Sequence, residues 1–209
     1  MTVTTDSPRR LVVAMTGATG AAIGIAVLRA LVTLGVETHL ILSRWARTTI
    51  AMETDHKLAD VTALADHVHG IDDQSASISS GSFQVDGMII APCSMKTLAA
   101  IRTGFGDNLI SRAADVTLKE RRRLVLAVRE TPLSPIHLEN MLALSRIGAT
   151  IMPPVPAFYT RPATVADIVE HTAARILDQF GLTVADIPRW AGPPDLLDTG
   201  EPTALRGAR

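Results

Sequence analysis

The chain has 209 residues and a mass of 22.2 kDa, which is within the size range of one domain. Its 20 basic and 21 acidic residues give a net charge of −1, and only 3% of residues are aromatic. These values argue against a general nucleic-acid binder and against a base-stacking platform. Hydrophobic residues make up 47% of the chain and the mean hydropathy is +0.25, so we expect an aliphatic core and buried subunit interfaces.

The single cysteine, Cys93, excludes an intrachain disulfide and fits a reducing compartment. The apolar stretch that follows the polar residues 1–10 is broken at Thr16-Gly17. It is too short for the core of a signal peptide or for a membrane span. We therefore expect a cytoplasmic protein without a membrane segment.

Short apolar runs alternate with helical patterns along the chain. Strands are predicted at 11–16, 37–43, 87–92, 124–128 and 149–152. Helices are predicted at 21–34, 45–53, 58–67, 97–103, 108–119, 135–146 and 165–180. Residues 70–82 are expected to form a loop, 153–156 a stiff proline turn, and the chain after Gly181 a tail or an arm. This alternation predicts an α/β fold with one doubly wound parallel sheet and no interdomain linker.

A glycine-rich segment follows the first predicted strand, with Gly17, Gly20 and Gly24 in the spacing G-x-x-G-x-x-x-G. Glycines between a strand and a helix let backbone N–H groups approach a phosphate. The spacing is neither the dinucleotide pattern nor the Walker pattern. The second strand ends at Ser43-Arg44 without the acid that a nicotinamide ribose needs. A mononucleotide such as FMN fits better, and a tight turn that binds nothing is the alternative.

The third strand leads into Pro92-Cys93-Ser94-Met95-Lys96-Thr97. Two hydroxyls and a lysine at a strand-to-helix junction suit a phosphate or the polar edge of a flavin. An ordinary helix cap by Ser94 is the alternative. Cys93 is interpreted as a buried small hydrophobe and not as a nucleophile.

The pair Arg129-Glu130 follows the apolar run 124–128 directly and precedes Pro132. Carboxyl ends of parallel strands face the ligand crevice, where a cation and an acid can bind an anion and move a proton. The two side chains would point to opposite sides if the strand continued, and Pro132 stops that continuation. A surface ion pair is the alternative.

Three further segments carry candidate residues. Lys119 belongs to a cationic run at 119–123 that is otherwise interpreted as a solvated helix end, and it is a candidate for the crevice. Tyr159 and Arg161 lie in a proline-bounded loop that suits either phosphate binding or loop packing. Trp190 is expected to cover a pocket, a neighbouring subunit or its own core.

Two other kinds of site are not expected. His56, His67 and His69 have no cysteine or third acid at a recognisable ligand spacing, so no metal site is predicted. The chain has no Gly-x-Ser-x-Gly elbow, so serine hydrolase chemistry is not predicted.

In their order and number, these segments resemble the UbiX-like flavin prenyltransferase family over residues 10–192. The motifs that carry the resemblance are Thr16-Gly17-Ala18-Thr19-Gly20-Ala21, 78–83, 92–98, 108–115, 118–121, 128–133, 137–141, 153–159 and 189–190. Within the family, the chain is most similar to the small subunit encoded beside hydroxyarylic acid decarboxylases.

The resemblance implies a flavodoxin-like, Rossmann-like fold that assembles as a homododecamer with active sites between subunits. It implies transfer of a dimethylallyl group from dimethylallyl monophosphate to N5 and C6 of reduced FMN, with no metal. The prenylated FMN would then pass to a UbiD-type decarboxylase. It also implies three segments: a disordered N-terminus at 1–9, an FMN-binding domain at 10–192 and a C-terminal tail at 193–209.

The resemblance also assigns roles to residues. Contacts with FMN are implied for Gly17, Ala18, Thr19, Ser43, Ser94, Met95, Lys96, Thr97 and Arg129. Contacts with the donor phosphate are implied for Lys119, Arg129, Tyr159 and Arg175. Catalytic roles are implied for Glu130 as the acid/base of ring closure, for Glu53 near the donor, for Trp190 around the prenyl group, and for Thr19 and Lys119.

The chain departs from the family pattern at two places. Thr19 stands where serine is common, and Asp72-Asp73-Gln74 stands where some members carry an aromatic residue.

Two alternatives to the prenyltransferase remain open on the sequence. One is a non-catalytic FMN-binding accessory or carrier subunit of an aromatic acid decarboxylase complex. The other is a cysteine-peptide decarboxylase, which the absence of a histidine near Ser43-Arg44-Trp45 argues against.

Overall fold

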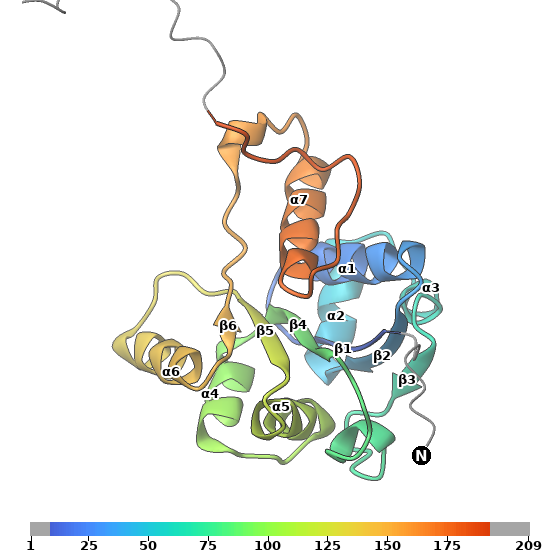
Figure 1. Ribbon diagram of the computed structural model, residues 1–209, viewed down its shortest axis with the longest axis vertical. Helices are drawn as coiled ribbons and strands as arrows, with labels where there is room; N and C mark the ends of the chain where they lie inside the picture. The colour runs from blue at the N-terminus through green and yellow to red at the C-terminus, as the bar shows by residue number, and fades with distance from the viewer. Residues whose placement is uncertain (1–8, 193–209) are drawn as a thin grey trace, which may run out of the picture.

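The computed structural model describes residues 9–192, in which one parallel sheet lies between two layers of helices (Figure 1). The sheet has six strands in the order β3-β2-β1-β4-β5-β6. Their bounds are β1 Arg10–Met15, β2 Glu37–Leu42, β3 His67–His69, β4 Gly87–Cys93, β5 Arg123–Val128 and β6 Thr150–Ile151. The predicted doubly wound parallel sheet is confirmed. The tail predicted at 193–209, and the N-terminus predicted at 1–9 apart from Arg9, lie outside the described residues.

The strand order places the ligand crevice beside β1. Without the three-residue edge strand β3, the order is 2-1-3-4-5, which is the flavodoxin-like order. With β3 it becomes 3-2-1-4-5-6, the order of dinucleotide-binding sheets. In both orders the winding reverses next to β1, so the loops that follow β1 and β4 diverge and leave a crevice at the carboxyl edge.

Seven α-helices and two 3₁₀ turns belong to the described chain. They are α1 Ala21–Thr33, α2 Arg44–Glu53, α3 Leu58–Thr62, η1 Ser77–Ser79, α4 Met95–Thr103, α5 Leu109–Lys119, α6 Pro135–Arg146, η2 Phe158–Thr160 and α7 Val165–Asp178. Side chains of α1, α2, α3 and α7 form one buried cluster, and those of α4, α5 and α6 form the other. Successive residues of β1 alternate between the two clusters, because side chains of a strand point to opposite faces.

One predicted helix is wrong in its second half. The helix predicted at 58–67 ends at Thr62, and His67 begins β3 instead. The Asp66 carboxylate accepts hydrogen bonds from the backbone N–H of Thr38 at 2.8 Å and from its hydroxyl at 3.1 Å. This contact brings the segment alongside β2, and the ladder hydrogen bonds to β2 then favour the extended form over local helix propensity.

The chain after β6 leaves the sheet as an extended arm (Figure 1). Residues 153–157 rise to η2, and α7 returns to pack on α1. The prolines at 153, 154 and 156 prevent regular pairing here, as the sequence predicted. Within residues 9–192, no helix has the length and apolar character needed to cross a membrane.

Candidate active site

Thr16 connects the loops that follow β1 and β4. Its hydroxyl donates to the carbonyl of Pro92 at 2.9 Å and accepts from the backbone N–H of Ser94 at 2.8 Å. The Arg129 N–H donates to the carbonyl of Cys93 at 3.1 Å, which fixes the end of β5 beside that of β4. Thr16 is 1% exposed, so this link is shielded from water. Thr16 was not among the predicted site residues, although a hydroxyl that ends a buried apolar run is a signal of such a link.

The turn at 17–20 has the close packing that its glycines indicate. A Cβ on Gly17 would lie 2.3 Å from the Cβ of Trp45, so a side chain at this position would displace α2. The φ angle of Gly20 is 106°, which favours glycine. Among residues 9–192, the backbone N–H groups of Gly17, Ala18 and Thr19 donate no hydrogen bond. They are free to bind an anion.

Glu53 lies at the same edge, beside the turn at 17–20. Its carboxylate accepts hydrogen bonds from the N–H of Gly20 at 2.8 Å and of Ala21 at 2.9 Å. It therefore caps the N-terminus of α1, where a negative charge interacts favourably with the helix dipole. The geometry makes Glu53 a residue that positions the turn.

The two serines at this edge cap helices. Ser43 accepts from the N–H of Ala46 at 3.0 Å, and Ser94 accepts from the N–H of Thr97 at 3.4 Å. The Ser94 hydroxyl also donates to the Thr97 hydroxyl at 3.2 Å. The helix-cap interpretation of Ser94 is thus confirmed, and it places the first turn of α4 at the crevice, including half-buried Met95 and exposed Lys96.

Arg129 and Glu130 do not form the surface ion pair that was the alternative. Both residues are exposed, and within the described part of the chain the Arg129 guanidinium has no carboxylate or hydrogen-bond partner. One oxygen of Glu130 accepts from the N–H of Thr131 at 3.0 Å. Within residues 9–192, a cation without a partner and a carboxylate with one backbone partner thus stand in consecutive positions at the end of β5.

Three other predicted residues lie after β6: Tyr159 in η2, Arg175 in α7 and Trp190 in the chain that follows α7. The Tyr159 ring packs edge-on against Trp190 with ring centroids 5.5 Å apart, and its hydroxyl lies 3.4 Å from Nε2 of His171. Arg175, one turn after His171 on α7, donates to Asp178 at 2.7 Å, and Asp178 also pairs with Arg189.

Lys119 is not at the crevice of its own chain. It ends α5 beside Glu120, with which it forms an ion pair that lowers the pKa of the Glu120 carboxyl. The strand β5 begins four residues later and runs about 17 Å to the carboxyl edge. Within one subunit Lys119 therefore lies away from the crevice, and its implied contact with the donor phosphate stays a prediction for a site between subunits.

Cys93 is confirmed as a buried small hydrophobe. It is 0% exposed, and burial raises the pKa of its thiol to about 12. A thiol that stays protonated is a poor nucleophile.

The sequence pattern that defines the Flavoprotein family matches residues 2–177. A relative from Streptomyces sp. (strain D7), called a probable UbiX-like flavin prenyltransferase, is 65% identical over 184 residues, which cover 88% of this chain and 92% of the relative. The chain belongs to the UbiX-like flavin prenyltransferase family. It is therefore an enzyme that transfers a prenyl group to a flavin.

Two solved structures resemble this flavin prenyltransferase closely. The complex of AnUbiX with FMN and dimethylallyl pyrophosphate is 60% identical, with a TM-score of 0.89 over 90% of this chain and 100% of that one. A dodecameric FMN-dependent UbiX-like decarboxylase from Escherichia coli O157:H7 is 61% identical, with a TM-score of 0.86 over 88% and 100% of the two chains. These structures confirm the predicted fold class.

Proposed function

We propose that the chain transfers a dimethylallyl group from dimethylallyl monophosphate to N5 and C6 of reduced FMN, and that the product serves a UbiD-type decarboxylase. One observation carries this proposal. Among residues 9–192 the Arg129 guanidinium has no partner, and it lies at the same sheet edge as the three N–H groups of the turn at 17–20 that donate no hydrogen bond there. An edge with a cation and convergent N–H donors suits phosphate groups.

The residues at this edge fit FMN in particular. Gly17 lets the turn pack tightly on Trp45 of α2, where a Cβ would lie 2.3 Å from the Trp45 Cβ, and Ala18 adds only a methyl group. The first turn of α4, with Ser94, Lys96 and Thr97, offers a second set of polar groups. It lies across the crevice from the turn that follows β1. Thr19 keeps the hydroxyl of the common serine and contributes one exposed methyl group.

The reduced flavin, when bound, supplies two nucleophilic positions for the prenyl group. Arg129 holds negative charge as the donor phosphate departs, because a fixed cation stabilises charge that develops during the reaction. Glu130 accepts or returns a proton during ring closure, since its carboxylate has only the Thr131 N–H as a partner in the described chain. Trp190 and the flavin face can stabilise an allylic cation and exclude water.

Residues of neighbouring subunits would complete the site. Lys119, Tyr159 and Arg175 are all implied in donor binding, but their hydrogen bonds and ion pairs within residues 9–192 join none of them to the crevice of their own chain. On the arm, Phe158 is 74% exposed and Trp190 is 61% exposed, as expected for surfaces that a second copy covers. The dodecameric relative supports this arrangement.

The test mixes the purified protein with reduced FMN and dimethylallyl monophosphate, followed by mass spectrometry of the released flavin. A mass gain of one prenyl unit supports the proposal, and no gain favours the carrier function. Glu130→Gln should bind FMN normally but stall after the first bond forms, leaving an uncyclised adduct. The matched control Glu139→Gln changes an exposed carboxylate on α6 and should leave conversion intact.

The donor and the compartment are parts of this proposal. The AnUbiX structure holds the pyrophosphate of the same prenyl group, so the assay should compare both esters at equal concentration. A cytoplasmic location is proposed because the only cysteine is a free, fully buried thiol.

A further inference from the structure

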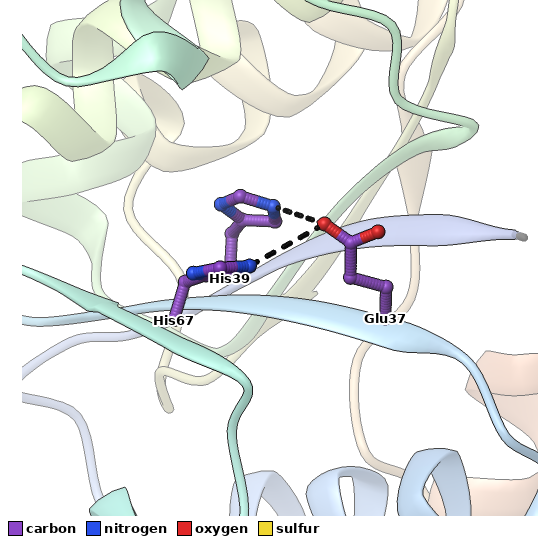
Figure 2. A group of neighbouring side chains, drawn as sticks. All are labelled: Glu37, His39 and His67. Carbon is purple, nitrogen blue, oxygen red and sulfur yellow. Dashed lines mark hydrogen bonds and ion pairs between the residues drawn. The ribbon is translucent and has the colours of Figure 1, made fainter.

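Four polar side chains gather on one face of the sheet at its β3 edge, away from the crevice. Glu37 and His39 lie two residues apart on β2, and His67 and His69 lie two residues apart on β3. His39 is opposite His67 in the ladder. Residues two apart in a strand share a face, so the ladder brings the four together. Figure 2 shows Glu37, His39 and His67 pointing toward one another.

The distances in this cluster match those of a metal site. Oε1 of Glu37 lies 3.1 Å from Nε2 of His39 and 3.5 Å from Nε2 of His67, and the three ligand atoms all lie within 4.8 Å of one another. Ligand atoms at the usual zinc bond lengths, around a tetrahedral ion, are about 3.4 Å apart. Small side-chain rotations would therefore suffice to place an ion between the three atoms.

Outer contacts orient two of the three ligands. Nδ1 of His39 lies 2.9 Å from Nε2 of His69, and hydrogen bonding between them leaves Nε2 of His39 as the ligand atom when Nδ1 carries the proton. Arg10 donates to both oxygens of Glu37, at 2.7 and 2.8 Å. Such outer contacts fix the ring tautomer and the carboxylate orientation at metal sites.

The protonation states also suit a metal. The Arg10 guanidinium lowers the pKa of the Glu37 carboxyl to about 2, so Glu37 is ionised at neutral pH. Burial lowers the pKa of His39, which is 3% exposed, and this favours the neutral ring. A carboxylate and neutral imidazoles are the forms that bind divalent ions.

We propose that Glu37, His39 and His67 bind one divalent transition-metal ion of the zinc class, with water in the fourth position. The side chain of His67 is 52% exposed, which gives an entering ion access. The ion would join β2 to the three-residue edge strand β3. The positive charge of Arg10 opposes the ion, so we expect micromolar affinity, weaker than that of closed structural zinc sites.

The proposed site is separate from prenyl transfer. Glu37 begins β2, while Ser43 follows its end at the crevice, and six residues of extended chain separate them by about 20 Å. The sequence analysis predicted no metal because it considered His56 with His67 and His69. His56 instead contacts Arg29, and the acid that completes the cluster lies thirty residues before His67.

The test titrates untagged, full-length, FMN-loaded protein with Zn²⁺ in competition with a chromophoric chelator, after removal of bound metal. We expect one Zn²⁺ per chain, and zinc-edge X-ray absorption should report two imidazoles and one carboxylate. His67→Gln should weaken binding at least about tenfold. It should also remove the rise in melting temperature that Zn²⁺ causes in the wild type. The matched control His56→Gln should bind Zn²⁺ as the wild type does.

Two outcomes would overturn the proposal. One is the absence of stoichiometric binding at Zn²⁺ concentrations far above micromolar. The other is equal affinity in His67→Gln and His56→Gln, which would indicate adventitious binding elsewhere on the chain. Both readouts are independent of prenyl transfer, so a negative result here leaves the proposed function in place.

Discussion

Replacing Thr16 by valine tests whether one hydroxyl holds the crevice loops together. Valine has nearly the shape of threonine, so the change removes two hydrogen bonds without a large change in volume. The Pro92 carbonyl keeps its bond from the Thr16 N–H at 3.1 Å, whereas the Ser94 N–H loses its only partner within residues 9–192. An unsatisfied N–H costs about 1–3 kcal/mol, and the partial exposure of Ser94 favours the lower half of that range.

A local cost of about 1–2 kcal/mol corresponds to a change of roughly 5- to 30-fold in an equilibrium constant. Hydrogen exchange of the peptide covering 93–97 should therefore speed up by about that factor in Thr16→Val, and FMN binding should weaken similarly. Thr16→Ser keeps the hydroxyl and serves as the control. Equal exchange rates and equal FMN affinities in the two variants would refute the reasoning.

Three further predictions concern other parts of the molecule. Gly17→Ala should lower FMN affinity by at least about tenfold in a fluorescence titration, because its new Cβ would overlap Trp45 and displace the turn; unchanged affinity would show that the turn adapts. Cys93 should resist thiol reagents in the native protein and react only on unfolding, because it is 0% exposed and burial raises the pKa of its thiol; rapid native labelling would contradict the buried position. The Arg189 guanidinium lowers the pKa of the Asp178 carboxyl below its ordinary value of 3.8, so their contact is fully stabilising above about pH 4 and weakens as the pH falls through the lowered pKa. Hydrogen exchange after α7 should rise over that acidic range in the wild type, and Asp178→Asn should show the same rise already at neutral pH.

The sequence by itself determined the sheet and the crevice edge. Apolar runs bounded by glycine and proline gave five of the six strands, because strands buried on both faces require continuous hydrophobic sequence. The turn at 17–20 and the pair Arg129-Glu130 were predicted to line the ligand crevice for a related reason. Polar groups directly after such strands must lie at the carboxyl edge, whatever the details of packing.

Only the tertiary structure decided which residues meet across the sheet and which do not. Lys119 was expected at the crevice, but α5 runs back to the amino edge before β5 begins, and no local pattern reveals that direction. The resemblance implied only that Glu53 lies near the donor, and the fold adds that its carboxylate caps the N-terminus of α1.

The edge strand β3 shows most clearly how the tertiary structure overrides a local sequence preference. Residues 58–67 favour a helix locally, yet pairing with β2 makes His67–His69 a strand and brings His67 beside Glu37. The histidines are visible in the sequence, but their acidic partner is not, because the contact depends on strand register. Local sequence sets which segments form strands, while contacts between distant segments are set by the free energy of the whole fold.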